Sequence, residues 1–252
     1  MQSVDEMIMT LTTNPEVLGV VEYGDDQSLE NYLAGDVDLF VILKRRDSPV
    51  ESLHFYAGGT PVDLNLTTLE EISQLEADHG FQVSALLGGR ILYDPTGELA
   101  GELARLRQRR QQAAPETLSA QTIAFIRHGH KHIFDKIRGR LETMPVFCRF
   151  LLCANIYWLI QSYFRVRHLT YRGEKRAIAY LQDNEPEIYQ ALTDFYNTPD
   201  LERQIKLAKW ITERVLAPVG GMWRDDEVLA FGGDDSDDLP ADGNEMFRKL
   251  FG

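Results

Sequence analysis

The 252-residue chain contains only two cysteines, Cys148 and Cys153. They lie five residues apart in a segment with helical periodicity, so their side chains point to different sides and are poorly placed to form a disulfide. A chain without disulfides is typical of a reducing compartment. The N-terminus also lacks the basic start and apolar stretch of a secretory signal. We therefore expect a cytoplasmic protein.

A long uninterrupted apolar run is also missing. The most apolar window, 146–164, is broken by Arg149, Asn155 and Gln161. It falls short of the ~18 consecutive apolar residues that indicate a membrane span. The window is therefore expected to form a buried helix, and no membrane association is predicted.

Basic residues are in the minority, with 26 Lys and Arg against 39 Asp and Glu and a net charge of −13. Nine of these acids but only two bases lie in residues 225–252. Such a balance does not favour duplex nucleic acid or an anionic membrane as the main partner. The apolar content of 44% allows a substantial core and excludes a chain that is disordered throughout.

The first part of the chain, residues 1–97, alternates helical and strand patterns. Helices are expected over 3–12 and 26–33, and a turn at 58–61 joins two β-rich runs into a hairpin. The segment 82–87 is compatible with either a helix or a strand. Five runs predict strands: 17–23, 37–43, 53–57, 62–67 and 90–93.

The remainder of the chain is helical in pattern. Residues 98–114 predict a connecting helix and linker, 115–220 a helical domain, and 221–252 an acidic tail. The fold class is therefore predicted to be α+β, with a mixed-sheet domain followed by an all-α helical bundle. The helical periods cover 119–141, 146–166, 173–182, 186–195 and 200–216.

Three aspartates carry the clearest chemical signal. Asp36 and Asp38 are two residues apart at the start of a predicted strand, so their side chains project from the same face. Asp63 lies at the start of another predicted strand. If that strand pairs with 37–43, the three carboxylates meet, repel one another and favour a divalent cation such as Mg²⁺.

Gly24 follows the strand predicted over 17–23 and precedes a predicted helix. A glycine turn before a helix lets backbone N–H groups approach phosphate oxygens. Together with the three acids, this turn indicates a site for a phosphate group.

These residues resemble the motif of the nucleotidyltransferase superfamily, which has the DNA polymerase β-like fold. That motif has a strand, a Gly-Ser turn, about ten residues, an Asp-x-Asp strand and a third Asp. The matching residues are Gly24-Asp25, Asp36-Val37-Asp38 and Asp63, and residues 89–94 resemble the strand that closes the domain. The likeness covers roughly residues 15–97. The helical half is similar, in architecture and in the stretch 163–180, to the substrate domains of bacterial aminoglycoside- and lincosamide-type nucleotidyltransferases, which implies that 115–220 is a substrate-binding domain.

The resemblance implies Mg²⁺-dependent transfer of a nucleoside monophosphate from an NTP, with ATP favoured, to a hydroxyl of a small-molecule acceptor. Asp36 and Asp38 would bind the metal, and through it the phosphates, while Asp63 would complete the site and help to activate the hydroxyl. Gly24 and Asp25 would lie against the triphosphate. The active site is expected in the cleft between the domains, and the resemblance allows a homodimer.

Several positions depart from the family pattern, and two of them lie next to the motif residues. Asp25 stands where the family has Ser, and Gly35 precedes Asp36 where Ser is usual. A carboxylate beside a triphosphate weakens binding by repulsion unless it turns away or takes a metal. The alternative hypothesis is therefore a catalytically relaxed nucleotide-binding or antitoxin-like module that keeps the fold.

Arg172 and Lys175 belong to the densest basic cluster, residues 165–176. They are candidate clamps that would reach the triphosphate from the helical domain. The same cluster is equally typical of a helix end whose cations favour the helix dipole. The sequence leaves both interpretations open, with Lys175 as the favoured clamp.

The sequence HGHKH places His128 and His132 four residues apart on one face of a predicted helix. Such a pair can hold a transition metal, although a solvated helix face is the favoured interpretation. Arg127 and His132 also match the loose Arg-x₄-His spacing of helical ribonuclease toxins. That pattern is short enough to arise by chance.

Overall fold

The computed structural model describes residues 3–24, 35–76, 80–112, 117–232 and 243–251. The chain divides into two compact units, residues 1–114 and 115–252. The predicted helix over 26–33 and the candidate Asp25 lie outside the described residues.

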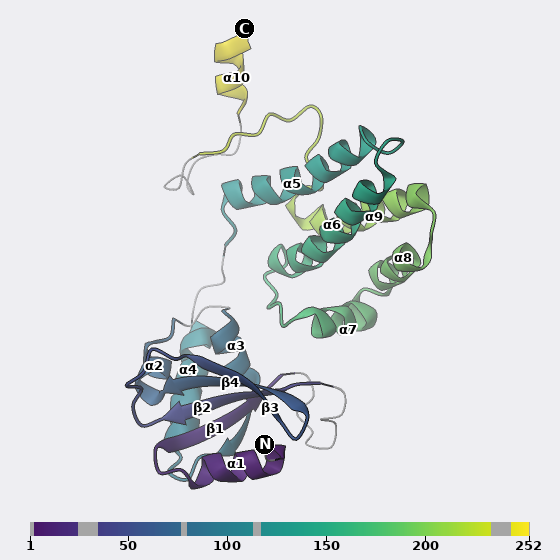
Figure 1. The fold of residues 1–252 in the computed structure, drawn as a ribbon. Helices are drawn as coiled ribbons and strands as arrows, with labels where there is room; N and C mark the ends of the chain where they lie inside the picture. Colours follow the sequence, from purple (N-terminus) through teal and green to yellow (C-terminus); the bar gives the residue numbers. More distant parts are fainter. Residues whose placement is uncertain (1–2, 25–34, 77–79, 113–116, 233–242, 252) are drawn as a thin grey trace. The chain divides into compact units, whose positions relative to one another are not determined.

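The first unit is built on a five-stranded mixed sheet with the order β3-β4-β2-β1-β5 (Figure 1). Strands β2 and β4 are parallel, and the other neighbours are antiparallel. This confirms a mixed sheet. The strands are β1 (Val17–Tyr23), β2 (Val37–Leu43), β3 (Ser52–Ala57), β4 (Thr60–Thr68) and β5 (Arg90–Tyr93).

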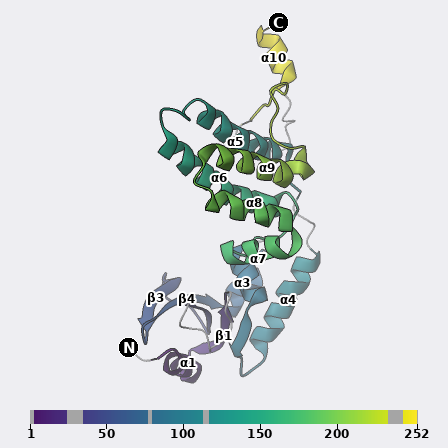
Figure 2. The same ribbon diagram turned by 90° about the vertical axis from the view of Figure 1, so that its right-hand side faces the viewer.

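Helices cover both faces of this sheet (Figure 2). Helix α1 (Val4–Thr13) packs on the face that carries Leu39 and Val41. The opposite face packs against α2 (Leu69–Gln74), α3 (Phe81–Gly88) and α4 (Glu98–Gln112). Burial on both faces explains the nearly continuous apolar sequence of β2.

Two segments of this unit needed the structure to place them. The ambiguous segment 82–87 lies within helix α3. The helix expected as a connection, α4, buries Leu99, Leu103 and Leu106 in the same apolar cluster as Val21. Helix α4 is therefore part of the core of the first unit.

The hairpin between β3 and β4 has a tighter turn than the sequence suggested. Gly58 and Gly59 alone form the turn, with φ of 60° and 92°, a conformation that glycine adopts without a steric penalty. As a result, Asp63 is the fourth residue of β4 and does not begin the strand.

The second unit is an all-helical bundle with one main apolar core. Helix α6 supplies many of its buried side chains, as its apolar sequence predicted, and it packs beside α9 (Figure 2). No helix of the described part of the chain is long and apolar enough to cross a membrane. The helices are α5 (Ala120–Arg138), α6 (Pro145–Arg165), α7 (Glu174–Asn184), α8 (Pro186–Asn197) and α9 (Leu201–Leu216), followed by the short 3₁₀ helix η1 (Ala217–Val219).

The region predicted as an acidic tail is partly attached to this bundle. Arg127 of α5 donates to the carbonyl oxygens of Gly221 and Met222, and Gln121 donates to the carbonyl oxygen of Ala230. Residues 221–230 therefore lie against α5. Helix α10 (Asn244–Phe251) forms the described end of the chain and buries none of its residues.

Candidate metal centre

One row of side chains crosses four strands of the sheet in the first unit. Tyr23 of β1 is the register partner of Asp38 of β2. Asp38 is paired with Asp63 of β4, and Asp63 with His54 of β3. Directly paired residues project from the same face of a sheet. The register therefore brings the predicted carboxylates of two strands side by side.

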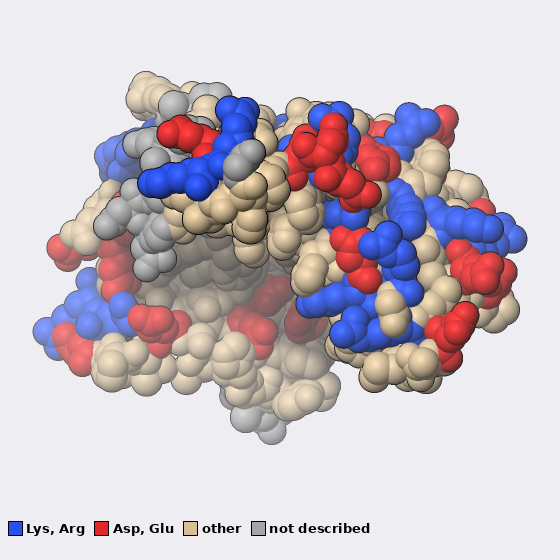
Figure 3. All heavy atoms as spheres, turned by 90° about the horizontal axis from the view of Figure 1, so that it is seen from above, with Lys and Arg blue, Asp and Glu red and all other residues tan. Residues whose placement is uncertain are grey.

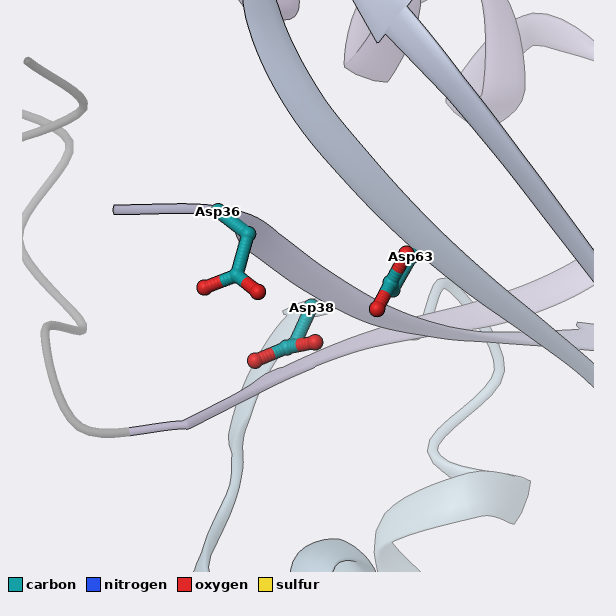
Figure 4. A group of neighbouring side chains, drawn as sticks. All are labelled: Asp36, Asp38 and Asp63. Atoms are coloured by element: carbon teal, nitrogen blue, oxygen red, sulfur yellow. The ribbon is translucent and has the colours of Figure 1, made fainter.

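Asp36 joins this row from the position two residues before Asp38. Figure 4 shows the three carboxylates turned toward a common space. One potential ligand atom from each of Asp36, Asp38 and Asp63 lies within 4.8 Å of the others. Asp36 is exposed, whereas Asp38 and Asp63 are half-buried. The predicted meeting of these three acids is thus present in the structure, while their catalytic role stays a prediction.

The donor set is suited to a hard divalent cation. All three groups supply carboxylate oxygens, which Mg²⁺ and Ca²⁺ prefer. With a metal–oxygen distance of about 2.1 Å, adjacent ligands of one octahedral Mg²⁺ are about 3.0 Å apart and opposite ligands about 4.2 Å apart. Oxygens within 4.8 Å of one another can approach these spacings through side-chain rotations. The residues present therefore fit a magnesium site.

Gly24 closes the row at the end of β1. Its φ is +104°, and a Cβ at this position would lie 2.8 Å from Oδ2 of Asp38. A side chain here would be strained by the backbone and would also push against the carboxylate. The backbone conformation therefore favours glycine at this position, and the approach of Asp38 leaves little room for a side chain, while the role of Gly24 as a phosphate turn stays a prediction.

Tyr23 and Asn65 support the other side of the row. Nδ2 of Asn65 donates a hydrogen bond to Oη of Tyr23 at 2.6 Å. Burial raises the pKa of the Tyr23 phenol, and the nearby carboxylates of Asp38 and Asp63 raise it further, which outweighs the effect of Asn65. The phenol therefore stays protonated at neutral pH beside the acids.

A pocket of about 330 Å³ lies further along the same sheet face. Phe40 and Asn65 line it, and they are the next residues on this face after Asp38 and Asp63. One such step along a strand is roughly 6.5 Å. The ion pair between Arg46 and Glu71, at 2.6 Å, forms part of the wall. The other lining residues are Glu51, Leu66, Leu75, Phe81 and Gln82.

The remaining candidates for triphosphate binding belong to the second unit or are not described. Arg172 is exposed, and Lys175 lies in the first turn of α7, as predicted. Nothing in the second unit tests their role as clamps. Asp25 lies outside the described residues.

The histidines of α5 take part in packing. His128 stacks on His132 with ring centroids 5.5 Å apart and also contacts Trp223 and Phe231. Burial, and then the neighbouring His132, lower the pKa of His128. No third potential metal ligand of the described residues joins this pair to form a cluster.

Arg127, the other half of the toxin-like spacing, is held by the region that follows η1. Its guanidinium contacts both carboxylate oxygens of Glu227, at 2.9 and 2.7 Å. These contacts, together with its bonds to the carbonyls of Gly221 and Met222, give Arg127 a structural task. The observed geometry does not favour a ribonuclease role.

Figure 3 shows Lys and Arg side chains next to Asp and Glu side chains among the described residues.

Sequence reasoning missed His54. Nδ1 of His54 lies 2.6 Å from Oδ1 of Asp63. The predicted hairpin could have identified His54, because the position of the turn determines which residue of the first strand pairs with Asp63. A four-residue turn at 58–61 would place Tyr56 there, whereas the observed two-residue turn places His54.

No protein-family model and no curated protein matches the chain. Nine solved chains match it in structure. One is a nucleotidyltransferase-like protein from Exiguobacterium sibiricum 255-15, which is 19% identical with a TM-score of 0.44. The match covers 98% of this chain and 91% of that one. A likeness of this size identifies neither substrate nor reaction, so the chemistry of the site rests on its own geometry.

Proposed function

We propose that the chain is a Mg²⁺-dependent nucleotidyltransferase that moves a nucleoside monophosphate from an NTP to a hydroxyl of a small molecule. The observation that carries the proposal is the convergence of Asp36, Asp38 and Asp63. Asp36 immediately precedes β2, Asp38 lies in β2, and Asp63 lies in β4, which pairs with β2. Three carboxylates in one place are unfavourable unless a cation compensates their charge.

Each residue has a distinct task in this proposal. Asp36 and Asp38 hold the cation, and Asp63 completes the site and faces the acceptor hydroxyl. When bound, Mg²⁺ neutralises phosphate charge and polarises the phosphorus centre. Gly24 keeps the edge of the site free of a side chain, so that Asp38 is not displaced.

The reaction is an in-line displacement. The acceptor oxygen forms a bond to the α-phosphorus, and the bond from that phosphorus to the bridging oxygen breaks. Pyrophosphate leaves with the electron pair of that bond, and the hydroxyl proton passes to a base at the site. Asp63 is the candidate base because it is an ionisable acceptor in the row.

The pocket beside the row supports a small-molecule substrate. Its volume of about 330 Å³ is at the lower end of the range of ligand sites. Apolar walls from Phe40 and Phe81, with amide groups from Asn65 and Gln82, allow it to hold a mixed polar and apolar group. We assign to it the part of a substrate that lies beyond the reacting phosphate.

The test combines binding and turnover. Calorimetry with ATP or GTP and Mg²⁺ measures nucleotide binding, and pyrophosphate release across a panel of hydroxylated acceptors measures transfer. We expect Asp38→Asn to abolish both the Mg²⁺ dependence of nucleotide binding and the release of pyrophosphate. The thermal unfolding temperature of this variant should stay close to that of the wild type. Pyrophosphate release that persists in this variant would refute the assignment.

The same experiment separates the alternative. Nucleotide binding without pyrophosphate release from any acceptor would support a relaxed or antitoxin-like binding module. That hypothesis was based on Asp25, which the structure does not describe.

A further inference from the structure

We propose that His54, supported by Ser52, is a positioning residue that orients Asp63 and thereby sets the affinity of the metal centre. The proposal deepens the proposed function, because it concerns the same site. It rests on contacts of the edge strand β3, which supplies none of the motif residues that carry the resemblance to nucleotidyltransferases.

Two consecutive contacts link Asp63, His54 and Ser52 along one face of the hairpin. Nδ1 of His54 lies 2.6 Å from Oδ1 of Asp63, and Nε2 of the same ring lies 3.0 Å from Oγ of Ser52. His54 is the register partner of Asp63. Ser52 is two residues further back on β3, so both side chains project from the same face.

The chemistry of the three groups fixes which of them donates in each of these two hydrogen bonds. An ionised carboxylate can only accept, so Nδ1 of His54 must donate to Asp63. In the neutral ring Nε2 is then an acceptor, and the hydroxyl of Ser52 donates to it. Each ring nitrogen therefore has a partner, and the ring is held at both ends.

The consequence for Asp63 is a fixed orientation. One carboxylate oxygen is held by His54, and Figure 4 shows an oxygen of Asp63 turned toward Asp38. Partners of this kind, which bind a metal-ligating group without touching the metal, usually change metal affinity by about 10–100-fold. Without His54, Asp63 must be ordered when the cation binds.

A purely structural role for His54 is poorly supported by its surroundings. Its side chain is 64% exposed, and β3 is the edge strand of the sheet. The other charged member of the contact, Asp63, is 40% exposed. Exposed pairs of this kind contribute little to stability, about 0–1 kcal/mol. The short contact is therefore better explained by the site than by folding.

Two substitutions of His54 separate its ring nitrogens. The amide nitrogen of Asn can occupy the position of Nδ1, next to Cγ, whereas the longer Gln places its amide near the position of Nε2. Asn therefore preserves the bond to Asp63, and Gln preserves the bond to Ser52. His54→Ala removes both.

The measurement is the binding of Mn²⁺ to the whole chain. The electron paramagnetic resonance signal of the unbound ion reports how much Mn²⁺ remains free. We expect His54→Ala and His54→Gln to raise the dissociation constant by about 10–100-fold and His54→Asn to restore most of the affinity. Ser52→Ala should have a smaller effect in the same direction. Circular dichroism and thermal unfolding should be unchanged in all four variants.

Two control variants are measured in the same Mn²⁺ titration. Asp38→Asn shows how much affinity is lost when the metal centre itself is removed. His132→Ala shows how much Mn²⁺ is bound by surface histidines instead of the centre. Unchanged Mn²⁺ affinity in His54→Ala would overturn the proposal for His54 and leave the proposed function intact. The proposal for His54 is also overturned if His54→Asn binds as weakly as His54→Ala. If the wild-type chain does not bind Mn²⁺, or Asp38→Asn binds equally well, the metal centre itself is refuted.

Discussion

The acidic row of the first unit and the histidines of helix α5 in the second were both candidate metal sites, and the structure separates them. The acids come from two strands and meet because the parallel register of β2 and β4 pairs Asp38 with Asp63. The histidines come from one helix. They stack on each other, and His128 also contacts the rings of Trp223 and Phe231. The comparison teaches that convergence from separate elements is a stronger sign of a site than spacing within one element.

The largest expected effect is the removal of one acid of the row. Asp38→Asn should weaken Mn²⁺ or Mg²⁺ binding by more than about 100-fold, which exceeds the usual effect of a residue that does not touch the metal. The double variant His128→Ala, His132→Ala should leave binding unchanged. Calorimetric titration of each variant measures the difference, and equal losses in the two would break the comparison.

The second prediction concerns His130, which faces the interior of the bundle. Its ring contacts Asn155 and Ser162 and stacks on Trp158. Burial lowers the pKa of His130 to about 4, against the weaker effect of Asn155. The unfolded chain binds the proton more tightly than the folded chain does. The contribution of His130 to the free energy of unfolding is therefore fully present above the unfolded pKa of about 6.5 and is lost as the pH falls toward 4.

Urea unfolding at several pH values checks this linkage. All three tryptophans lie in the second unit, so their fluorescence reports that unit. We expect its free energy of unfolding to fall by on the order of 3 kcal/mol between pH 7.5 and 4 through this group. His130→Gln should flatten that part of the profile. An unchanged slope in this variant would show that other groups cause it.

The third prediction compares Gly129, which lies within α5, with Gly139, which directly follows that helix. A Cβ on Gly129 would lie 2.2 Å from the ring of Trp158. Gly129→Ala should therefore destabilise the second unit by about 1–3 kcal/mol, as overpacked cores do. At Gly139 a Cβ meets none of the described atoms within 4 Å, and Gly139→Ala is the matched control. Similar melting temperatures for the two variants would contradict the observed packing.

The smallest effect on folding is expected at the edge of the metal centre. Gly24→Ala forces a left-handed backbone on alanine, which costs about 1–2 kcal/mol. Its methyl group also crowds Asp38, so Mn²⁺ affinity should fall. Gly35→Ala, whose Cβ meets no described atom within 4 Å, should preserve that affinity. Equal Mn²⁺ binding by both variants would show that Gly24 is not required.

Much of this arrangement could be predicted from the sequence. The strands over 17–23 and 37–43 were predicted to the residue, because valine-rich runs bounded by turn residues leave little choice. The three acids followed from period-2 alternation and one assumed pairing. Parallel pairing of β2 with β4 then made that assumption correct.

The parts that could not be predicted depend on register and tertiary contact. The length of the turn at Gly58 decides the partner of Asp63, and composition does not fix it. Arg127 offered no sign that it would bind Glu227, one hundred residues away in sequence. The role of α4 in the first core required knowledge of what its apolar stripe packs against.

The two-glycine hairpin has a practical consequence for changing this protein. Because β3 is antiparallel to β4, a four-residue turn over 58–61 in place of the two-residue turn would slide the edge strand past Asp63 while its side chains keep facing the same way. This slip of two positions would exchange the imidazole of His54 for the phenol of Tyr56. A change confined to the bend would thus let evolution or an engineer replace the neighbour of an acid without substituting that neighbour.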